Sequence, residues 1–229
     1  MNRRQFFDQC AEQWDDCADT HAHDRSMEVI VPFFKIKKNQ SVLDVGTGTG
    51  TLLPYLREMT GKRASITGLD FSPRMLEKAR EKYGSRFSYV RASADDMPFP
   101  TATFDVVVSL NVFPHFSHKL QALKESWRVL KDGGKLIIAH TGSIRHIHAH
   151  HKKIGGPVAG DIMPTGEVMR TMLVKAGFVK SKLLAGKTFH FIEAFKPRDG
   201  ELPSGKSPAI RHVACDKCCH CGGCAGKLL

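Results

Sequence analysis

Short apolar runs alternate with segments of helical apolar spacing along most of the chain. Short runs rich in apolar residues predict β-strands, whereas apolar residues three or four positions apart predict amphipathic helices. On this basis strands are expected at 42–45, 64–69, 87–91, 104–109, 135–139, 178–184 and 188–195. Helices are expected at 3–17, 26–34, 49–59, 72–83, 119–130 and 166–176.

Residues with special backbone preferences set several of these boundaries. Ser72 is expected to cap a helix that starts at Pro73 and ends at Gly84, because a serine hydroxyl accepts a backbone N–H and proline suits the first helical position. Pro54 either disturbs the middle of its helix or restricts its start. The Asp-Gly-Gly sequence at 132–134 is expected to stop the helix before it.

The alternation of strands and helices predicts an α/β fold. Helical crossovers place successive strands side by side in parallel, with helices on both faces of the sheet. The last two predicted strands have no helix between them, so we expect them to form a closing antiparallel pair. The expected fold is therefore doubly wound and mostly parallel.

The composition of the chain changes after Lys196. The α/β domain is expected to cover 1–196, with a helical lid over about residues 1–38. Residues 197–212 are rich in proline, glycine, serine and charge, which predicts a linker. A cysteine-rich tail is expected at 213–229.

Length and charge narrow the class of protein. A chain of 229 residues that is 41% hydrophobic can form one sizeable core. No apolar run reaches about 18 residues, and the N-terminus lacks the apolar stretch of a signal peptide, so no membrane span is expected. We expect a cytoplasmic location, where cysteines stay reduced. The net charge of +11 is spread along the chain without an arginine-rich run, which argues against nucleic acid as a partner.

The sequence SVLDVGTGTG at 41–50 runs from a strand into three glycines and then a helix. Glycines let a ligand approach the backbone, and a helix start offers unpaired N–H groups, so this loop is typical of a nucleotide-type site. The dinucleotide fingerprint G-x-G-x-x-G fails because position 51 is Thr51. A phosphate-binding P-loop fails too, because no Gly-Lys-Ser/Thr follows.

Two acids follow the first two predicted strands. A carboxylate at Asp44, on a buried strand, is costly unless a cation or backbone donors pair with it. Asp70 ends the next strand, where an acid can accept both hydroxyls of a ribose. These positions predict a ligand that has a ribose and no pyrophosphate.

Four motifs in order resemble the class I S-adenosylmethionine-dependent methyltransferases, and most closely the branch of the ubiquinone/menaquinone-biosynthesis enzymes. They are VLDVGTGTG, GLDFSPRMLEKAR, ADDMPFPTATFDVVVS and RVLKDGGKLII. The resemblance covers about residues 7–196. It implies a Rossmann-like sheet of seven strands with an antiparallel last strand, S-adenosyl-L-methionine as cofactor, and a small-molecule acceptor that the motifs do not specify.

The resemblance also implies roles for single residues. The residues expected to contact the methionine part of the cofactor are Asp44, Gly46, Thr47, Gly48, Gly50 and Asn111. Those expected at the ribose and adenine are Asp70, Phe71, Ala94 and Asp95. Where the family often has an aspartate, this chain has Ser93, so a backbone contact or Asp95 is expected to compensate. Trp14 matches an aromatic of the family's N-terminal lid, although its helical spacing suits a plain core position equally.

His115 follows the fourth predicted strand, at the edge of the sheet where ligands bind. It is the candidate general base, which methyl transfer needs only when the acceptor is a hydroxyl or thiol. The alternative is a hydrogen-bonded histidine that lies at the surface or supports neighbouring residues without contacting the reactants.

Four histidines lie in the sequence SIRHIHAHHKK, in a segment that commonly covers the acceptor in this family. If it is helical, His146 and His150 share one face and suit a metal, with Asp161 or Glu193 as a further ligand. The alternative is a set of solvated histidines.

Cysteines at steps of three end the chain. Cys215, Cys218, Cys221 and Cys224 suit zinc, an iron–sulfur cluster or another soft metal, with His212 and His220 as further candidate ligands. The spacing does not identify the metal, and a reduced tail without a ligand is the alternative.

Several functions remain open at this point. A small-molecule methyltransferase that acts by in-line displacement is favoured. A metal or metalloid methyltransferase and a metal-sensing binding protein on the same fold are the alternatives. An RNA methyltransferase is disfavoured, because the chain has no Asn-Pro-Pro-Tyr-type motif.

Overall fold

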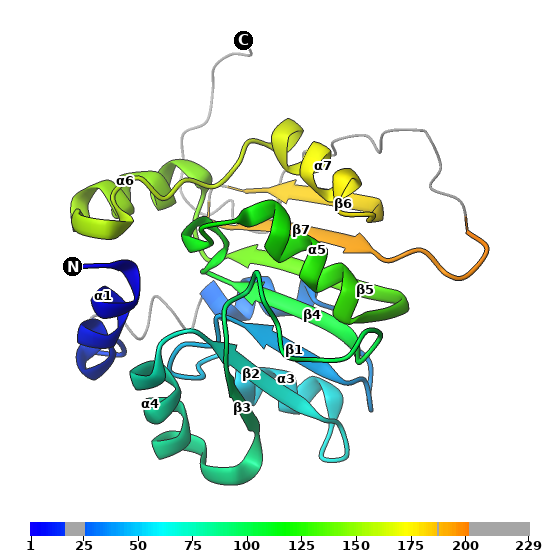
Figure 1. Ribbon diagram of the computed structural model, residues 1–229, viewed down its shortest axis with the longest axis horizontal. Coiled ribbons are helices and arrows are strands. Elements are labelled where there is room, and N and C mark those ends of the chain that lie inside the picture. Colours follow the sequence, from blue (N-terminus) through cyan, green and yellow to red (C-terminus); the bar gives the residue numbers. More distant parts are fainter. Residues whose placement is uncertain (17–25, 187, 202–229) are drawn as a thin grey trace, which may run out of the picture.

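One seven-stranded sheet forms the centre of the computed structural model, which describes residues 1–16, 26–186 and 188–201 (Figure 1). The strands are β1 (Val42–Val45), β2 (Ile66–Asp70), β3 (Ser88–Arg91), β4 (Phe104–Leu110), β5 (Leu130–His140), β6 (Val179–Ala185) and β7 (His190–Phe195). Their order across the sheet is β3-β2-β1-β4-β5-β7-β6. Neighbours are parallel except at β7, which is antiparallel to both β5 and β6. The predicted α/β fold with an antiparallel last strand is confirmed.

Helices connect the strands and cover the sheet. The α-helices are α1 (Arg3–Cys10), α3 (Leu53–Thr60), α4 (Pro73–Tyr83), α5 (Lys119–Val129), α6 (Ile144–Ile154) and α7 (Gly166–Lys175), and residues 26–30 are helical too. Short 3₁₀ turns are η1 (Ala11–Gln13), η2 (Val31–Phe33), η3 (Gly84–Arg86), η4 (Phe113–His115) and η5 (Gly156–Val158).

Two apolar cores lie on opposite faces of the sheet, because successive side chains of a strand point in opposite directions. In β1, Leu43 and Val45 belong to the core that includes residues of α5 and α7. Val42 belongs to the other core, which includes residues of α3 and of the segment 27–36. The near-continuous apolar sequence of the central strands follows from this burial on both faces.

A local signal in the sequence located the start of α4 correctly, whereas α3 begins at Leu53, after its predicted start at residue 49. Ser72 caps α4 by accepting the Met75 N–H at 3.2 Å, and Pro73 occupies the first turn. At α3 the helix begins at Leu53 with Pro54 in its first turn, so Pro54 restricts the start and does not disturb the middle.

The predicted stop of α5 at Asp-Gly-Gly is wrong. The helix ends at Val129, and Leu130 is already extended and pairs with Phe104 as the first residue of β5. The two glycines lie inside β5, where the register with β4 shifts. Gly134 is required there, since a Cβ atom would lie 2.6 Å from the Lys131 carbonyl oxygen. Strand pairing thus overrides the local turn signal.

Tertiary contacts continue past Lys196, where the sequence placed the end of the domain. The buried Lys196 ammonium donates to the Leu130 carbonyl at 2.8 Å and lies 4.1 Å from the Trp127 ring centroid. Glu201 pairs with Lys180. The predicted linker beyond Glu201 and the cysteine tail lie outside the described residues.

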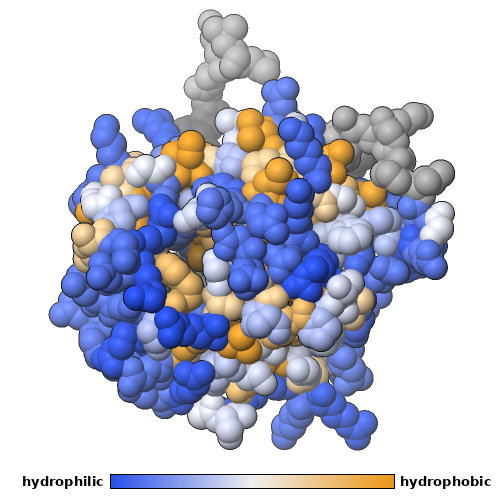
Figure 2. Space-filling view, in the orientation of Figure 1, coloured by the Kyte–Doolittle hydropathy of each residue, from blue (hydrophilic) through white to orange (hydrophobic). Residues whose placement is uncertain are grey.

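The surface drawn in Figure 2 is mostly hydrophilic, with apolar residues gathered over α7. Val168 and Val174 of that helix are exposed. Within 1–16, 26–186 and 188–201, no helix has the length and apolar character needed to cross a bilayer.

A buried histidine pair joins β5 to β7. His140 and His190 are direct cross-strand partners, and both are 3% exposed. Neither ring nitrogen of His190 has a hydrogen-bond partner among the described residues. Burial lowers the pKa of His190 to about 4 and that of His140 well below its ordinary value. Both imidazoles are therefore neutral at neutral pH.

We predict that this pair makes the fold sensitive to acid. A folded-state pKa below the unfolded value gives stability that is present above about pH 6.5 and is lost as the pH falls toward 4. The decrease in unfolding free energy between pH 7.5 and pH 5 should therefore be about 1–2 kcal/mol smaller in His190→Leu than in the parent protein. Urea unfolding at both pH values measures this difference. The exposed His118→Leu serves as control, and equal losses in His190→Leu and the parent would contradict the assignment.

Candidate functional site

The carboxyl ends of the parallel strands meet at one edge of the sheet, next to α1 and α6 (Figure 1). The glycine loop after β1 is fixed against β2, because the backbone N–H groups of Gly46 and Thr47 both donate to the Leu69 carbonyl, at 2.7 and 3.0 Å. Ligands of open α/β sheets bind at this edge, so the site is built here.

The three glycines of the loop have left-handed backbones but different surroundings. A Cβ atom on Gly46 would lie 2.5 Å from Val112, and one on Gly50 would lie 2.9 Å from Tyr83. Packing therefore requires these two glycines. Gly48, with φ +55°, has nothing within 4 Å of its Cβ position. Among the three, Gly48 presents open backbone to a ligand.

Thr47 faces the sheet. Its methyl carbon would lie 2.8 Å from a Cβ atom on Gly68, so Gly68 makes room for it in β2. The Thr47 hydroxyl is buried and has no hydrogen-bond partner among the described residues. This hydroxyl is available to a ligand. In the sequence, Thr47 was a candidate only because it lies between the glycines of the loop.

Asp44 is a buried acid with an unpaired carboxylate oxygen. Its side chain is 2% exposed, and its Oδ2 atom accepts no hydrogen bond from the described part of the chain. Burial raises the pKa of Asp44 to about 7; the Thr47 side chain lowers this pKa, and the nearby charge of Asp70 raises it further. A buried carboxylate without donors is costly, and a cationic ligand would relieve that cost. The site therefore fits a ligand that carries positive charge.

Asp70 has partners on both oxygens. Its Oδ2 accepts the Gly48 N–H and its Oδ1 accepts the Ser72 N–H, each at 2.9 Å. Burial raises the pKa of Asp70 to about 6 in spite of these two bonds. Each oxygen keeps a second lone pair for a ligand hydroxyl. Asp70 thus joins the glycine loop to the start of α4, a role that its sequence position did not reveal.

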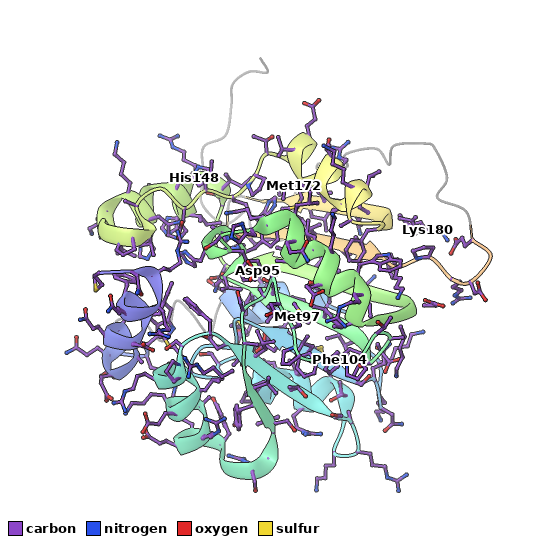
Figure 3. All side chains as sticks on the ribbon, viewed as in Figure 1. Asp95, Met97, Phe104, His148, Met172 and Lys180 are labelled. Atoms are coloured by element: carbon purple, nitrogen blue, oxygen red, sulfur yellow. The ribbon has the colours of Figure 1, made fainter. Side chains whose placement is uncertain are left out.

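The predicted adenine contacts follow two neighbouring strands, Phe71 after β2 and Ala94 with Asp95 after β3. Phe71 is half-buried and packs edge-to-face against Phe7, with ring centroids 5.8 Å apart. Ala94 is buried, and Asp95 lies in the loop after β3 (Figure 3). The hydroxyl of Ser93 donates to Asp95, so this pair occupies the place of the family's aspartate.

Asn111 connects the ends of β4 and β5. Its Oδ1 accepts the Thr141 N–H at 2.9 Å, and its Nδ2 donates to the Thr141 hydroxyl at 3.0 Å. Its backbone is left-handed, with φ +57°. Such strain collects at functional sites, and here it places an exposed amide at the sheet edge.

Side chains of the N-terminal segment (residues 1–16) attach it to this edge of the sheet. The sequence patterns did not identify these side chains as part of the site. Asp8 accepts a hydrogen bond from the Ser72 hydroxyl at 2.6 Å, and Asp15 accepts one from the Thr49 hydroxyl at 2.8 Å. Trp14 is 39% exposed and packs against Phe7, so it belongs to this segment and not to the main core.

His115 lies in η4, directly after β4. Its Nδ1 atom is 2.7 Å from Oδ2 of Asp161, and its ring packs against Phe7 and His151 at centroid distances of 5.3 and 4.6 Å. Burial lowers the pKa of His115, although the Asp161 carboxylate opposes this. The imidazole is therefore neutral at neutral pH and can accept a proton.

The histidine-rich sequence is helical, as α6, and its histidines have different surroundings. His151 is buried, with Nδ1 2.7 Å from the Asp161 carbonyl oxygen. His148 (Figure 3) accepts the Met163 N–H at 2.9 Å. His146 and His150 are exposed and stack with centroids 6.3 Å apart. Two of the histidines thus stabilise the fold.

The predicted metal pair on α6 lacks its expected further ligands. Asp161 instead binds Arg3 and His115, and Glu193 lies within β7 opposite Ile137. Across 1–16, 26–186 and 188–201, no three His, Cys, Asp or Glu side chains gather as a metal site. Cys215, Cys218, Cys221 and Cys224 lie outside the described residues.

Comparisons with known proteins agree with this geometry. A family model described as "Methyltransferase domain" matches residues 43–138. A demethylmenaquinone methyltransferase of Deinococcus radiodurans is 35% identical over 133 residues, which are 52% of this chain and 55% of that protein. A ubiquinone/menaquinone biosynthesis C-methyltransferase of Pectobacterium carotovorum is 30% identical over 170 residues, 62% of this chain and 68% of that protein. The chain thus spans little more than half the length of the first relative.

Solved structures share the fold. A putative methyltransferase of Haloferax volcanii, in complex with its activator Trm112, aligns with TM-score 0.69 at 21% identity, over 84% of this chain and 98% of that one. An S-adenosylmethionine-dependent methyltransferase of Aquifex aeolicus aligns with TM-score 0.61 at 26% identity, over 73% and 88%. With the glycine loop and the two buried acids in place, the chain belongs to the class I S-adenosylmethionine-dependent methyltransferases, on the branch of the ubiquinone/menaquinone C-methyltransferases.

Proposed function

We propose that this protein binds S-adenosylmethionine at the carboxyl edge of the sheet and transfers its methyl group to a hydroxylated ring of the quinol type. The observation that carries the cofactor assignment is the buried Asp44 carboxylate, whose Oδ2 atom has no partner among the described residues, in a strand that leads into the open backbone of Gly48. S-adenosylmethionine has the matching chemistry, because it carries a sulfonium and an amino group as cations and supplies an activated methyl group.

Different residues of the site would contact different parts of the cofactor. Asp44 would pair with a positive charge, and Gly48 would let the ligand approach its backbone. Asp70 would accept ribose hydroxyls through its remaining lone pairs, with Phe71 and Asp95 beside the adenine. The chain mainly aligns the reactants, since an in-line displacement depends on geometry.

The acceptor side is proposed from His115 and from two relatives, one a demethylmenaquinone methyltransferase and the other a ubiquinone/menaquinone biosynthesis C-methyltransferase. Phe7 packs edge-to-face against His115 and gives the imidazole an apolar neighbour. Nδ1 of His115 is bound to Asp161, and Nε2 has no partner among the described residues. Nε2 would take the proton from an acceptor hydroxyl, and the electron pair of that O–H bond would drive attack of a ring carbon on the methyl carbon, while the bond from the methyl group to sulfur breaks and S-adenosylhomocysteine leaves. Loss of the proton on that ring carbon, with return of a proton to the oxygen, would restore the aromatic hydroxyl.

We predict that cofactor affinity rises with pH. The pKa of Asp44 is about 7 in the free protein, and a cationic ligand binds the ionised form better, so the dissociation constant should fall as the pH rises from 5.5 to 8. Asp44→Asn should bind roughly 10- to 100-fold more weakly at pH 8, at about 1–3 kcal/mol for the lost interaction, with a smaller pH dependence.

Titration calorimetry with S-adenosylmethionine, in two buffers of different ionisation enthalpy, measures both the affinity and the protons released. Asp132→Asn removes an exposed acid at the opposite edge of the sheet and is the matched control. The same pH dependence in Asp44→Asn and the parent would assign the pH effect to another group.

We predict that His115→Gln loses turnover and keeps cofactor affinity. General-base catalysis contributes about 10²- to 10⁴-fold, so the formation of S-adenosylhomocysteine with a demethylmenaquinol acceptor should fall by that order. His118→Gln changes an exposed histidine three positions away and should retain the parental rate. Full turnover in His115→Gln would show that the acceptor needs no base from this residue.

A further inference from the structure

We propose that Asp161 is the positioning residue for His115, and that Arg3 connects docking of the N-terminal segment to this histidine–carboxylate pair. The inference rests on the proposed function, because it assumes that His115 accepts a proton. It concerns two side chains that lie 158 positions apart in the sequence and meet at the edge of the sheet.

The backbone of Asp161 is fixed on both sides of its carboxylate. Its N–H donates to the Val158 carbonyl at 2.9 Å, and its carbonyl oxygen lies 2.7 Å from Nδ1 of the buried His151. The carboxylate is itself buried, and each of its oxygens has one partner: Oδ2 binds His115 and Oδ1 binds Arg3. Asp161 is therefore held in one orientation between them.

This orientation selects the tautomer of His115. A carboxylate acceptor 2.7 Å from Nδ1 keeps the ring proton on that nitrogen. The lone pair then lies on Nε2, which is the atom proposed to accept the acceptor's proton. Phe7 and His151 pack against the imidazole and limit its rotation. His151 thus acts twice, on the ring of His115 and on the backbone of Asp161.

Arg3 brings the N-terminal segment into the same network. Its guanidinium binds Oδ1 of Asp161, the Pro157 carbonyl at 3.2 Å and the Ser117 hydroxyl at 3.1 Å. Ser117 lies just after η4, while Pro157 and Asp161 lie in and just after η5, so one side chain of α1 joins these two segments. Arg4, the next residue, points elsewhere and approaches Asp8 at 3.9 Å.

The charges around His115 come from several elements. Asp161 favours the protonated imidazole, while Arg3, His151 and the burial of the ring disfavour it. His140 of β5 lies close enough to interact with the same ring, and Lys119 of α5 interacts with Asp161. Removing Arg3 or lifting α1 would leave the Asp161 charge uncompensated. The histidine is therefore kept in its proton-accepting form when the N-terminal segment is docked.

The test uses two variants that should move the pKa of His115 in opposite directions. Asp161→Asn removes the anion that stabilises the imidazolium, so the pKa should fall. Arg3→Met removes a neighbouring cation, so the pKa should rise. A variant that only loosened the fold would expose the ring and raise the pKa in both cases. Titration of the His115 imidazole by NMR measures the shifts without an acceptor.

Turnover gives the second readout. Asp161→Asn should lower kcat with demethylmenaquinol at least about tenfold at every pH, because the tautomer is no longer fixed. Arg3→Met should shift the acid limb of the kcat profile to higher pH and approach the parental rate above it. Asp161→Glu keeps the carboxylate and should recover part of the activity. It provides a second test of this position if Asp161→Asn folds poorly. Arg4→Met, the same charge change on the same helix, should match the parent.

The outcomes separate this inference from the proposed function. Shifts of the same sign in Asp161→Asn and Arg3→Met, or no shift in Asp161→Asn, would overturn the positioning role even if methyl transfer occurs. Opposite shifts without turnover of demethylmenaquinol would support the network and reject the proposed acceptor class.

Discussion

The carboxylate of Asp70 accepts hydrogen bonds from the backbone of two loops, the glycine loop at Gly48 and the start of α4 at Ser72. A buried acid needs such donors, and these two fix the shape of the sheet edge around it. Asp44, one strand away, is equally buried and has no donor to its Oδ2 atom among the described residues. This difference in hydrogen bonding is the reason that we propose Asp44 as the acid that binds the ligand.

The N-terminal segment depends on the same edge. Asp8 binds Ser72, Asp15 binds Thr49 and Arg3 binds Asp161, so its polar side chains attach it to loops after β1 and β2 and to the segment after α6. The apolar contacts of Phe7 with Phe71 and His115 lie among these bonds. A segment attached in this way lies over the proposed cofactor site and the proposed base together.

Strands, helices and the glycine site could be predicted from the sequence because their signals are local: apolar spacing, Ser72 with Pro73, and a run of glycines after a buried strand. The end of α5 was predicted to within one residue, but the start of β5 at Leu130 was not, because its pairing with Phe104 decides it. Asp161 was assigned to a metal with the α6 histidines, whereas its partners come from positions 46 and 158 residues away. The roles of the cysteine tail remain predictions.

The position of β7 has a consequence for the order of folding. The last strand in the sequence lies between β5 and β6, and β6 pairs with no other strand. During synthesis, the first five strands can assemble in chain order, but β6 has no place in the sheet until the chain has grown through Phe195. The apolar face of β6 therefore has no strand beside it until then. This interval is when a nascent chain of this topology is most exposed to aggregation, and when a chaperone would be most useful to it.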